Sequence, residues 1–367
     1  MNIFGDNRIV MTLDAGGTNF VFSAIKSGKE IVGPIRYPSH GNDLRICLQT
    51  IQDGFHEIGS KLPDPAVAIS FAFPGPANYP AGIIGDLTNL PAFRGGVALG
   101  PMLKEQFSIP VFINNDGDLF TYGEALAGIL PDINKKLIAS GSEQQYKNLI
   151  GLTLGTGFGG GIVRNNELYI GDNSVAGEVW AMSNRVDPEI NAEEGISTRA
   201  VVNEYFRITG LPREYEISPK DIFDIATGKL DGDQSAAKKS FERLGTFLGD
   251  IIANLMTVLD GIVVIGGGLT GASSLYMPAV VQELNNIFVT PAGSKVNRLV
   301  QKVFNLDNTG EEQEFLHRYS KKIQIPFSEG FISYDASPRL AVSTSKLGAS
   351  RAIALGAYAF ALHDLDR

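Results

Sequence analysis

The sequence predicts an α/β protein made of two halves with the same architecture. Short apolar runs end repeatedly in glycine-rich turns, which is typical of buried strands followed by tight connections. The order of strand, glycine turn and hairpin occurs near residue 10 and again near residue 150, with almost no sequence identity between the two copies. A chain of 367 residues is also too long for one ordinary core. We therefore expect two related lobes.

The first half contains a regular alternation of predicted strands and helices. Apolar and β-branched runs predict strands at residues 8–14, 19–25, 66–73 and 111–113, the second being the return strand of a hairpin. Residues 43–58 carry apolar side chains at helical spacing, and a helix is expected to continue from the strand at 111–113 to about residue 130.

The second half repeats this order. We expect strands at residues 149–154, 161–163, 167–170 and 261–265, and helices at 199–208, 236–259 and 348–362. The stretch 302–339 is more polar and shows no clear period, so we interpret it as an insertion of unassigned structure.

Composition restricts the classes of function. The formal net charge is -9 and no basic block stands out, which argues against a nucleic-acid partner. One cysteine, Cys47, excludes a disulfide within the chain. The first residues lack the basic and apolar regions of a signal peptide, and no apolar run is long enough to span a membrane. We expect a cytoplasmic protein.

Two glycine loops are candidate phosphate sites. The first is the turn after the strand at 8–14, and its candidate residues are Asp14, Gly16, Gly17, Thr18 and Asn19. Glycines let backbone amides approach a phosphate, and Asp14 can hold a magnesium ion through water. An ordinary hairpin turn explains the same residues equally well.

The second loop spans residues 154–161 and contains five glycines. A turn needs one or two glycines, so five favour a backbone that surrounds a ligand, with Gly155, Thr156 and Gly157 as candidate phosphate contacts. No Lys-Ser or Lys-Thr pair follows, and strand-like residues come next, so neither a Walker loop nor a dinucleotide fingerprint fits.

Two further strand ends carry candidate site residues. Gly267 and Gly268 could seat a nucleotide base, although a helix-entry turn is the simpler interpretation of this glycine run. At the end of the strand at 111–113 lies Asn114-Asn115-Asp116-Gly117-Asp118. A carboxylate flanked by amides suits a base for phosphoryl transfer to an alcohol. We predict that Asp118 caps the following helix and that Asp116 is free.

Taken in order along nearly the whole chain, these motifs resemble the ROK family of sugar kinases and repressors. The resemblance implies an actin-like ATPase fold, with two RNase H-like lobes around a central cleft for ATP and sugar. It also implies lobes at residues 1–118, joined by the closing helix at 346–367, and at 119–345, with the insertion near 302–339. A homodimer is expected from the resemblance alone.

The resemblance also assigns roles to individual residues. Asp116 falls on the catalytic base, and Asp14 on the residue that organises Mg2+. The sugar ligands would be Asn89, Asn115, Asp116, Glu178 and Glu193, with Glu194 close enough to compete with Glu193. The ATP phosphates would be held by Asp14, Gly16, Gly17, Thr18, Asn19, Gly155, Thr156 and Gly157, with Gly267 and Gly268 near the adenosine.

Two departures from the family pattern concern the sugar site and zinc. After Glu178 the sequence reads Val179-Trp180-Ala181, so the family's histidine is missing. The family's cysteine cluster is also missing, and we expect no structural zinc. Trp180, the only tryptophan, could rebuild the wall of the sugar site by stacking, but we interpret it as a core residue.

The sequence therefore predicts an ATP-dependent sugar kinase that phosphorylates a hydroxyl, expected to be O6, of a hexose or N-acylhexosamine. One alternative is a degenerate family member that binds sugar without catalysis. Another is an actin-like ATPase motor, which would not need the sugar-binding set. A repressor would need a DNA-binding domain before the first loop, and the sequence has only 13 residues ahead of Asp14.

Overall fold

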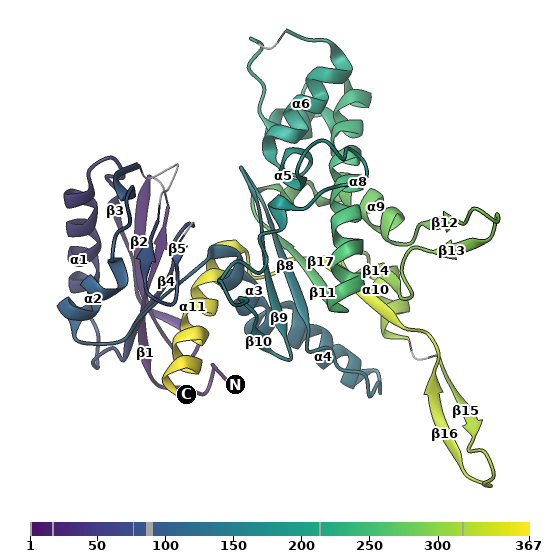
Figure 1. Ribbon diagram of the computed structural model, residues 1–367, viewed down its shortest axis with the longest axis horizontal. Helices are drawn as coiled ribbons and strands as arrows, with labels where there is room; N and C mark the ends of the chain where they lie inside the picture. The colour runs from purple at the N-terminus through teal and green to yellow at the C-terminus, as the bar shows by residue number, and fades with distance from the viewer. Residues whose placement is uncertain (1, 17, 76, 86–90, 213, 318) are drawn as a thin grey trace. The chain divides into compact units, whose positions relative to one another are not determined.

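The computed structural model describes residues 2–16, 18–75, 77–85, 91–212, 214–317 and 319–367. Their contacts divide the chain into two compact units (Figure 1). Unit 1 comprises residues 1–128, 160–177 and 346–367, and unit 2 comprises residues 129–159 and 178–345. The lobe boundaries expected from the resemblance stay a prediction.

Unit 1 is built on a five-stranded sheet in the order β3-β2-β1-β4-β7. Strands β1, β2 and β3 form an antiparallel meander, and β1, β4 and β7 are parallel. The strands of this sheet are β1 (Ile9–Ala15), β2 (Asn19–Lys26), β3 (Lys29–Pro38), β4 (Ala68–Ala72) and β7 (Val111–Asn114). The predicted hairpin near residue 10 is therefore confirmed.

Helices and short strands complete unit 1. They are α1 (Leu44–Ser60), β5 (Ala77–Asn78), β6 (Ile83–Ile84), the 3-10 turn η1 (Pro91–Phe93), α2 (Leu99–Phe107), α3 (Asp116–Ala127), β10 (Glu167–Leu168) and α11 (Ala349–Leu365). Helix α1 begins where Asp43 accepts a hydrogen bond from the Ile46 N–H at 3.0 Å. Its apolar face is buried on the sheet, where the Phe55 ring lies 5.1 Å from that of Phe22.

Helices α3 and α11 of unit 1 cross with almost no side-chain layer between them. A Cβ atom on Gly123 would lie 1.9 Å from the Ala352 carbonyl oxygen, and one on Gly356 would lie 1.9 Å from that of Leu119. Such backbone-to-backbone contact is possible only for glycine. These contacts fix the C-terminal helix α11 on α3, and both helices belong to unit 1.

A second sheet repeats this arrangement of strands, and all of its strands except β10 and most of β9 belong to unit 2. The sheet runs β10-β9-β8-β11-β17-β14, and β8, β11, β17 and β14 are parallel to one another. These strands are β8 (Leu149–Leu154), β9 (Phe158–Arg164), β11 (Ile262–Gly266), β14 (Lys302–Asn305) and β17 (Arg339–Thr344). An antiparallel ribbon followed by parallel strands repeats the β3-β2-β1-β4-β7 order, so the predicted duplication is confirmed.

The remaining elements of unit 2 are mainly helical. They are α4 (Ile129–Ala139), η2 (Val179–Ala181), α5 (Ala192–Gly195), α6 (Thr198–Thr209), α7 (Pro219–Ala226), α8 (Gln234–Leu259), η3 (Gly268–Ala272), α9 (Ser273–Leu284) and α10 (Thr309–Leu316). Two hairpins complete the unit: β12 (Ile287–Val289) with β13 (Lys295–Asn297), and β15 (Ser320–Gln324) with β16 (Phe331–Asp335). The stretch 302–339 thus contributes β14 to the sheet and also contains α10 and the β15–β16 hairpin.

Candidate active site

The carboxyl ends of three parallel strands bring the unit 1 candidates to one edge of the sheet. Asp14 of β1 is in register with Ala72 of β4, and Ala72 is in register with Asn114 of β7. Neighbouring strands lie about 4.8 Å apart, so Asp14 and the start of α3 are separated by roughly 10 Å along this edge. Open α/β sheets bind their ligands at such edges.

Asp116 is the first residue of α3, directly beyond this edge. The Gly117 N–H donates to Asn115 Oδ1 at 2.7 Å and to Asp116 Oδ1 at 2.9 Å. Asn115 is therefore the N-cap of α3, and the prediction that Asp118 caps this helix is wrong. Asp118 lies in the first turn and is buried. The Asp116 side chain is exposed, with its Oδ1 engaged by the Gly117 N–H, and its role as the base stays a prediction.

The electrostatics of Asp116 suit a proton acceptor. The protein atoms crowded around this carboxylate limit hydration of its charged form and raise its pKa above the usual value. The Gly117 N–H opposes this shift by donating to the charged form, and the negative charge of Asp14 adds to it. A carboxylate with a raised pKa takes up a proton more readily than an ordinary aspartate.

The turn between β1 and β2 holds the first glycine loop. The Gly16 N–H donates to the Asn19 carbonyl oxygen at 3.0 Å, and a Cβ atom on Gly16 would lie 2.9 Å from that same oxygen. Glycine is therefore required at this position by the turn itself. The Asp14 and Thr18 side chains are exposed. Gly17 lies outside the described residues, as does Asn89 with the rest of residues 86–90.

Close glycine contacts within unit 1 link the start of α3 to the segment at 160–177. A Cβ atom on Gly117 would lie 2.4 Å from the Gly160 carbonyl oxygen, and one on Gly177 would lie 2.9 Å from the same oxygen. Asp116 directly precedes Gly117, and Glu178 directly follows Gly177. Asp116, the predicted base, and Glu178, a predicted sugar ligand, are thus each adjacent in sequence to a glycine that packs on the Gly160 carbonyl oxygen.

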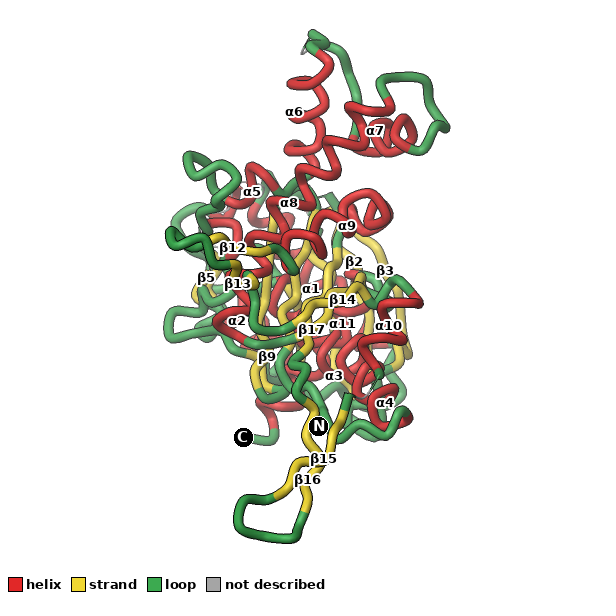
Figure 2. The backbone as a smooth tube through the Cα atoms, turned by 90° about the vertical axis from the view of Figure 1, so that its right-hand side faces the viewer, coloured by secondary structure: helices red, strands yellow, loops and turns green. Residues whose placement is uncertain are grey.

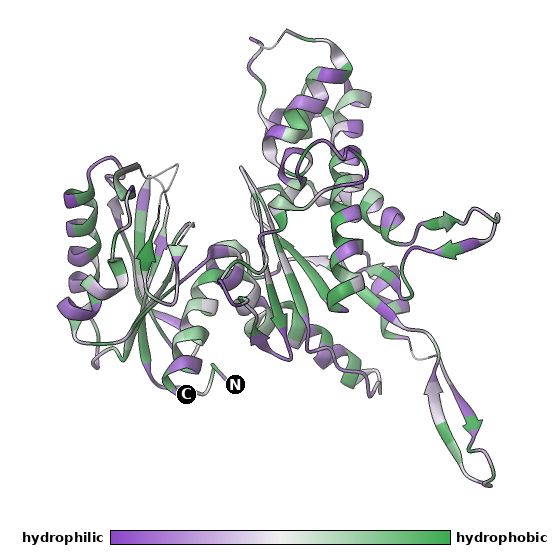
Figure 3. Cartoon of the chain, viewed as in Figure 1, coloured by the Kyte–Doolittle hydropathy of each residue, from purple (hydrophilic) through white to green (hydrophobic). Residues whose placement is uncertain are grey.

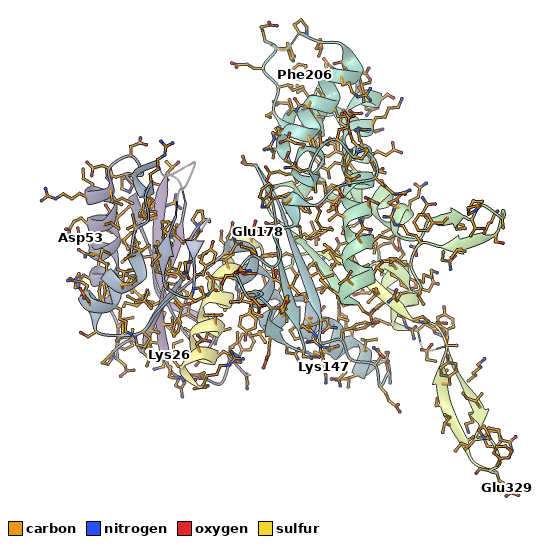
Figure 4. The ribbon with its side chains drawn as sticks, in the orientation of Figure 1. Lys26, Asp53, Lys147, Glu178, Phe206 and Glu329 are labelled. Atoms are coloured by element: carbon orange, nitrogen blue, oxygen red, sulfur yellow. The ribbon has the colours of Figure 1, made fainter. Side chains whose placement is uncertain are left out.

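Trp180 is not a core residue. Its side chain is 43% exposed, and its indole N–H donates to Glu178 Oε2 (Figure 4 labels Glu178). The interpretation of Trp180 as part of the core is therefore wrong. The alternative interpretation was that the Trp180 ring stacks on the sugar. An exposed ring that is hydrogen-bonded to Glu178, a predicted sugar-binding residue, is consistent with that role.

The second glycine loop lies in unit 2, at the end of β8. The Gly155 N–H donates to the Gly157 carbonyl oxygen at 3.0 Å, and the Thr198 N–H donates to the Gly155 carbonyl oxygen at 2.9 Å. A Cβ atom on Gly155 would meet no atom within 4 Å, and Thr156 is exposed. The packing therefore does not explain glycine at 155, and the loop has space for a ligand.

Arg199 fixes this loop, and sequence reasoning missed it. Its Nη1 donates to the Thr156 carbonyl oxygen at 3.1 Å, and its Nη2 contacts Glu193 at 2.7 Å and Glu194 at 2.6 Å. Glu193 Oε2 also accepts from the Phe158 N–H at 3.0 Å. Arg199 lowers the pKa of Glu194 by its hydrogen bond. The sequence signal that could have indicated this role was the position of Arg199 a few residues after the two glutamates.

The two remaining candidate glycines follow β11. Gly267 has φ of 92°, and a Cβ atom there would lie 2.3 Å from the Leu154 carbonyl oxygen, next to the β8 loop. Gly268 is exposed with open space around it. Helical turns η3 and α9 begin here, so the simpler interpretation as a helix-entry turn is correct, and it leaves a nucleotide role for Gly268 available.

Two glycines of the second loop are explained by packing within the protein. A Cβ atom on Gly161 would lie 2.5 Å from the Gly117 carbonyl oxygen, and one on Gly159 would lie 2.6 Å from Thr153 Oγ1. These glycines permit close packing of β9, so the argument from five glycines overstated the ligand contacts. Within the described part of the chain, no group of three histidine, cysteine or acidic side chains is placed to hold a metal ion.

Comparison with known proteins decides the family. The ROK family profile matches residues 10–310, which is most of the sequence. The chain belongs to the ROK family. A solved glucokinase from Parabacteroides distasonis is 49% identical, covers 99% of both chains and superposes with a TM-score of 0.89. This ROK chain thus has the predicted α/β fold with two actin-like lobes.

Other relatives of this ROK chain bear related names. An N-acetyl-D-glucosamine kinase from Vibrio cholerae is 28% identical over 72% of this chain and 85% of its own length. A ROK family glucokinase from Streptomyces griseus, solved with glucose and AMPPNP, is 18% identical, with a TM-score of 0.60 over 95% of this chain and 98% of its own. None of the described helices is both long and apolar enough for a membrane span.

Proposed function

We propose that this carbohydrate kinase transfers the γ-phosphoryl group of ATP to the 6-hydroxyl of a hexose or N-acylhexosamine, with Asp116 as the base. One observation carries the proposal: an exposed carboxylate with a raised pKa begins α3 at the carboxyl edge of the unit 1 sheet. Glucose is the first sugar to test, because the relative with 49% identity is named a glucokinase.

Asp116 would align the acceptor hydroxyl and take its proton as the oxygen attacks phosphorus. Phosphoryl transfer needs mostly alignment and charge neutralisation, and a base of this kind contributes about 10²–10⁴-fold. The Asn115 cap and the contact of Gly117 with Gly160 hold the Asp116 backbone in one position. Proximity of this kind requires a rigid support, which the N-terminus of α3 supplies.

Each unit would contribute one phosphate loop. In unit 1, Gly16, Thr18 and Asn19 of the β1–β2 turn, with Gly17, would contact phosphate oxygens, and the exposed Asp14 carboxylate suits a magnesium ion held through water. In unit 2, Thr156 offers an exposed hydroxyl beside the open space at Gly155. Magnesium-bound ATP would supply the phosphoryl group and neutralise its charge. Gly267 and Gly268 would lie near the adenosine.

The sugar would be held by amide and carboxylate side chains. Asn115 Oδ1 is engaged by the Gly117 N–H, so its amide nitrogen, 3.4 Å from Tyr79 Oη, would be the part that binds sugar. Glu178 is exposed beside Trp180, whose ring would stack on the sugar. Glu193 already accepts from Phe158 and Arg199, so its sugar contact would use a remaining lone pair. Asn89 completes the proposed set.

The experiment measures ADP release with glucose, N-acetylglucosamine and 6-deoxyglucose. Sugar-dependent release with the first two, and none with 6-deoxyglucose, is expected because only the deoxy sugar lacks the acceptor oxygen. Turnover of 6-deoxyglucose would contradict O6. ADP release without any sugar would indicate an ATPase motor. Sugar binding without ADP release would indicate a degenerate family member, in keeping with Ala181 at the position of the family's histidine.

The variant Asp116→Asn tests the base. We expect kcat to fall by about 10²-fold or more while sugar affinity is retained, because the amide keeps the shape but cannot accept the proton. Trp180 is the only tryptophan, so its fluorescence reports sugar binding to the inactive variant. A wild-type rate in Asp116→Asn would refute the assignment. Cytoplasmic location and the lack of a nucleic-acid partner stay predictions from composition.

A further inference from the structure

The β15–β16 hairpin extends away from the sheet of unit 2 as a two-stranded arm. Figures 1 and 2 show it projecting from the body of the unit in two perpendicular views. Residues 320–335 form the two strands and their connection, and they lie beyond residues 10–310 matched by the ROK profile. An isolated two-stranded hairpin is marginally stable in water. The arm therefore needs a surface to pack against.

One face of the arm is apolar and the other is mostly polar. Ile323 pairs with Ile332 and Lys321 pairs with Tyr334, and residues paired across two strands share a face. Ser320, Lys322 and Gln324, paired with Asp335, Ser333 and Phe331, lie on the opposite face. Figure 3 shows the resulting patches of apolar residues along the arm. This amphipathic pattern is that of a strand pair with one covered side.

The tip of the arm presents an aromatic side chain to solvent. Phe327 is fully exposed and has φ of 60°. Glu329, labelled in Figure 4, marks the same end of the arm. A left-handed backbone is unfavourable for a bulky residue, and such strain persists where it serves a function. The fully exposed Phe327 side chain is therefore available as an anchor for another surface.

The apolar surface of the arm has the size of half an interface. On the apolar face and at the tip, Ile323, Ile325, Phe327, Ile332 and Tyr334 are exposed by 38%, 39%, 110%, 53% and 47%. At ~150–250 Å² for a large side chain, this amounts to roughly 600 Å². Two arms in a twofold dimer would present about 1,200 Å² before the receiving surfaces are counted, which reaches the ~1,200–2,000 Å² of stable interfaces.

Unit 2 also carries a surface that could receive an aromatic tip. A cavity of about 540 Å³ is lined by Leu284, Leu299, Val300, Phe304, Tyr319 and Pro338, together with polar residues. Tyr319 lies at the base of the arm, and eight residues at ~3.3 Å each separate it from Phe327 by about 25 Å. The Phe327 ring therefore cannot reach the cavity of its own chain while its hairpin is intact.

We propose that the arm packs against a second copy of this chain, with Phe327 of each copy in the cavity of the other. The donor and the receiving cavity lie on the same chain, so a twofold dimer satisfies both at once. The proposed chemistry uses only small molecules and requires no other protein. The arm therefore provides a dimer contact that is additional to the residues matched by the family profile.

The mass in solution tests the arm. Sedimentation equilibrium is expected to give a dimer for the wild type, and Ile332→Lys is expected to weaken dimerisation by about 10²-fold or more, because it places a charge in the apolar face. Gln324→Lys adds the same charge to the polar face and should leave the dimer intact. A monomeric wild type, or equal effects of the two substitutions, would overturn the proposal.

Cysteine pairing tests the position of the tip. Cys47 is buried, so engineered thiols react against a quiet background. A mixture of Phe327→Cys and Val300→Cys chains should form a disulfide-linked pair under mild oxidation, whereas Lys322→Cys with Val300→Cys should not. Equal linkage in both mixtures, or none in either, would overturn the exchange. ADP release, measured in parallel, separates this result from any failure of the proposed kinase activity.

Discussion

Gly117→Ala should damage catalysis more than it damages the fold. A Cβ atom at this position would lie 2.4 Å from the Gly160 carbonyl oxygen and 2.9 Å from its carbonyl carbon, both of them backbone atoms. An ordinary contact is about 3.4 Å, so the N-terminus of α3 must move away by about 1 Å. Asp116 directly precedes Gly117 and moves with it.

The expected magnitudes follow from that displacement. Overpacking of this size costs about 1–3 kcal/mol of the free energy of unfolding, which a domain of ordinary stability tolerates. A misplacement of ~1 Å at the base can cost about 10²-fold in rate. We therefore expect a folded protein with kcat reduced by about 10²-fold, measured by ADP release and urea denaturation on the same preparation.

Gly59→Ala is the matched control for this experiment. Gly59 also lies in a helix of unit 1, but a Cβ atom there would meet only the Met11 sulfur at 3.9 Å. Alanine should leave kcat unchanged and raise stability by about 0.5–1 kcal/mol. If Gly117→Ala behaves like Gly59→Ala in both assays, the close contact at Gly160 does not position Asp116.

Three further variants test other contacts. Asp116→Asn should be more stable than the wild type at pH 7, because the protein atoms around the Asp116 carboxylate limit its hydration and raise its pKa, so that its charged form opposes folding. The advantage should vanish below the ordinary pKa of 3.8, and a less stable variant at pH 7 would contradict this. Arg199→Ala should change the free energy of unfolding by less than ~1 kcal/mol, since the pair with Glu193 is partly exposed to solvent. It should nevertheless raise KM for ATP by loosening the glycine loop, and an unchanged KM would refute the positioning role. Arg298→Ala should cost about 1–3 kcal/mol in urea denaturation, because the buried carboxylates of Asp250 and Glu283 lose one of their two arginine partners and keep only Arg185; an unchanged free energy of unfolding would contradict this.

The sequence predicted most of the fold where local patterns and tertiary structure agree. Apolar runs of five to seven residues predicted β1, β4, β8 and β11, because strands buried on both faces are apolar throughout. Strand β14 was missed because only four residues, starting with Lys302, enter the sheet. Its assignment depends on pairing with β17, which is distant along the sequence.

The candidate site was predicted less completely than the fold. The order of the motifs predicted Asp116 and the glycine loops as site residues. It could not show which side chain caps α3, because asparagine and aspartate are both favourable N-cap residues. Composition could not show that Gly161 serves packing against α3, because a glycine required by a neighbour looks the same as one required by a ligand. Arg199 was missed because its role exists only once α6 lies beside the β8 loop.

The crossing of α3 with α11 sets the order in which the chain can mature during synthesis. Residues 346–367 belong to the same unit as residues 1–128, yet all of residues 129–345 are translated between them. At about 5–20 residues per second, the ribosome needs roughly 10–50 s after finishing α3 to deliver its partner helix. Throughout this interval the glycine face of α3 at Gly123 has no cover from Ala352. Unit 1 can therefore complete its fold only once the C-terminal helix has been synthesised, which is after unit 2 has been made.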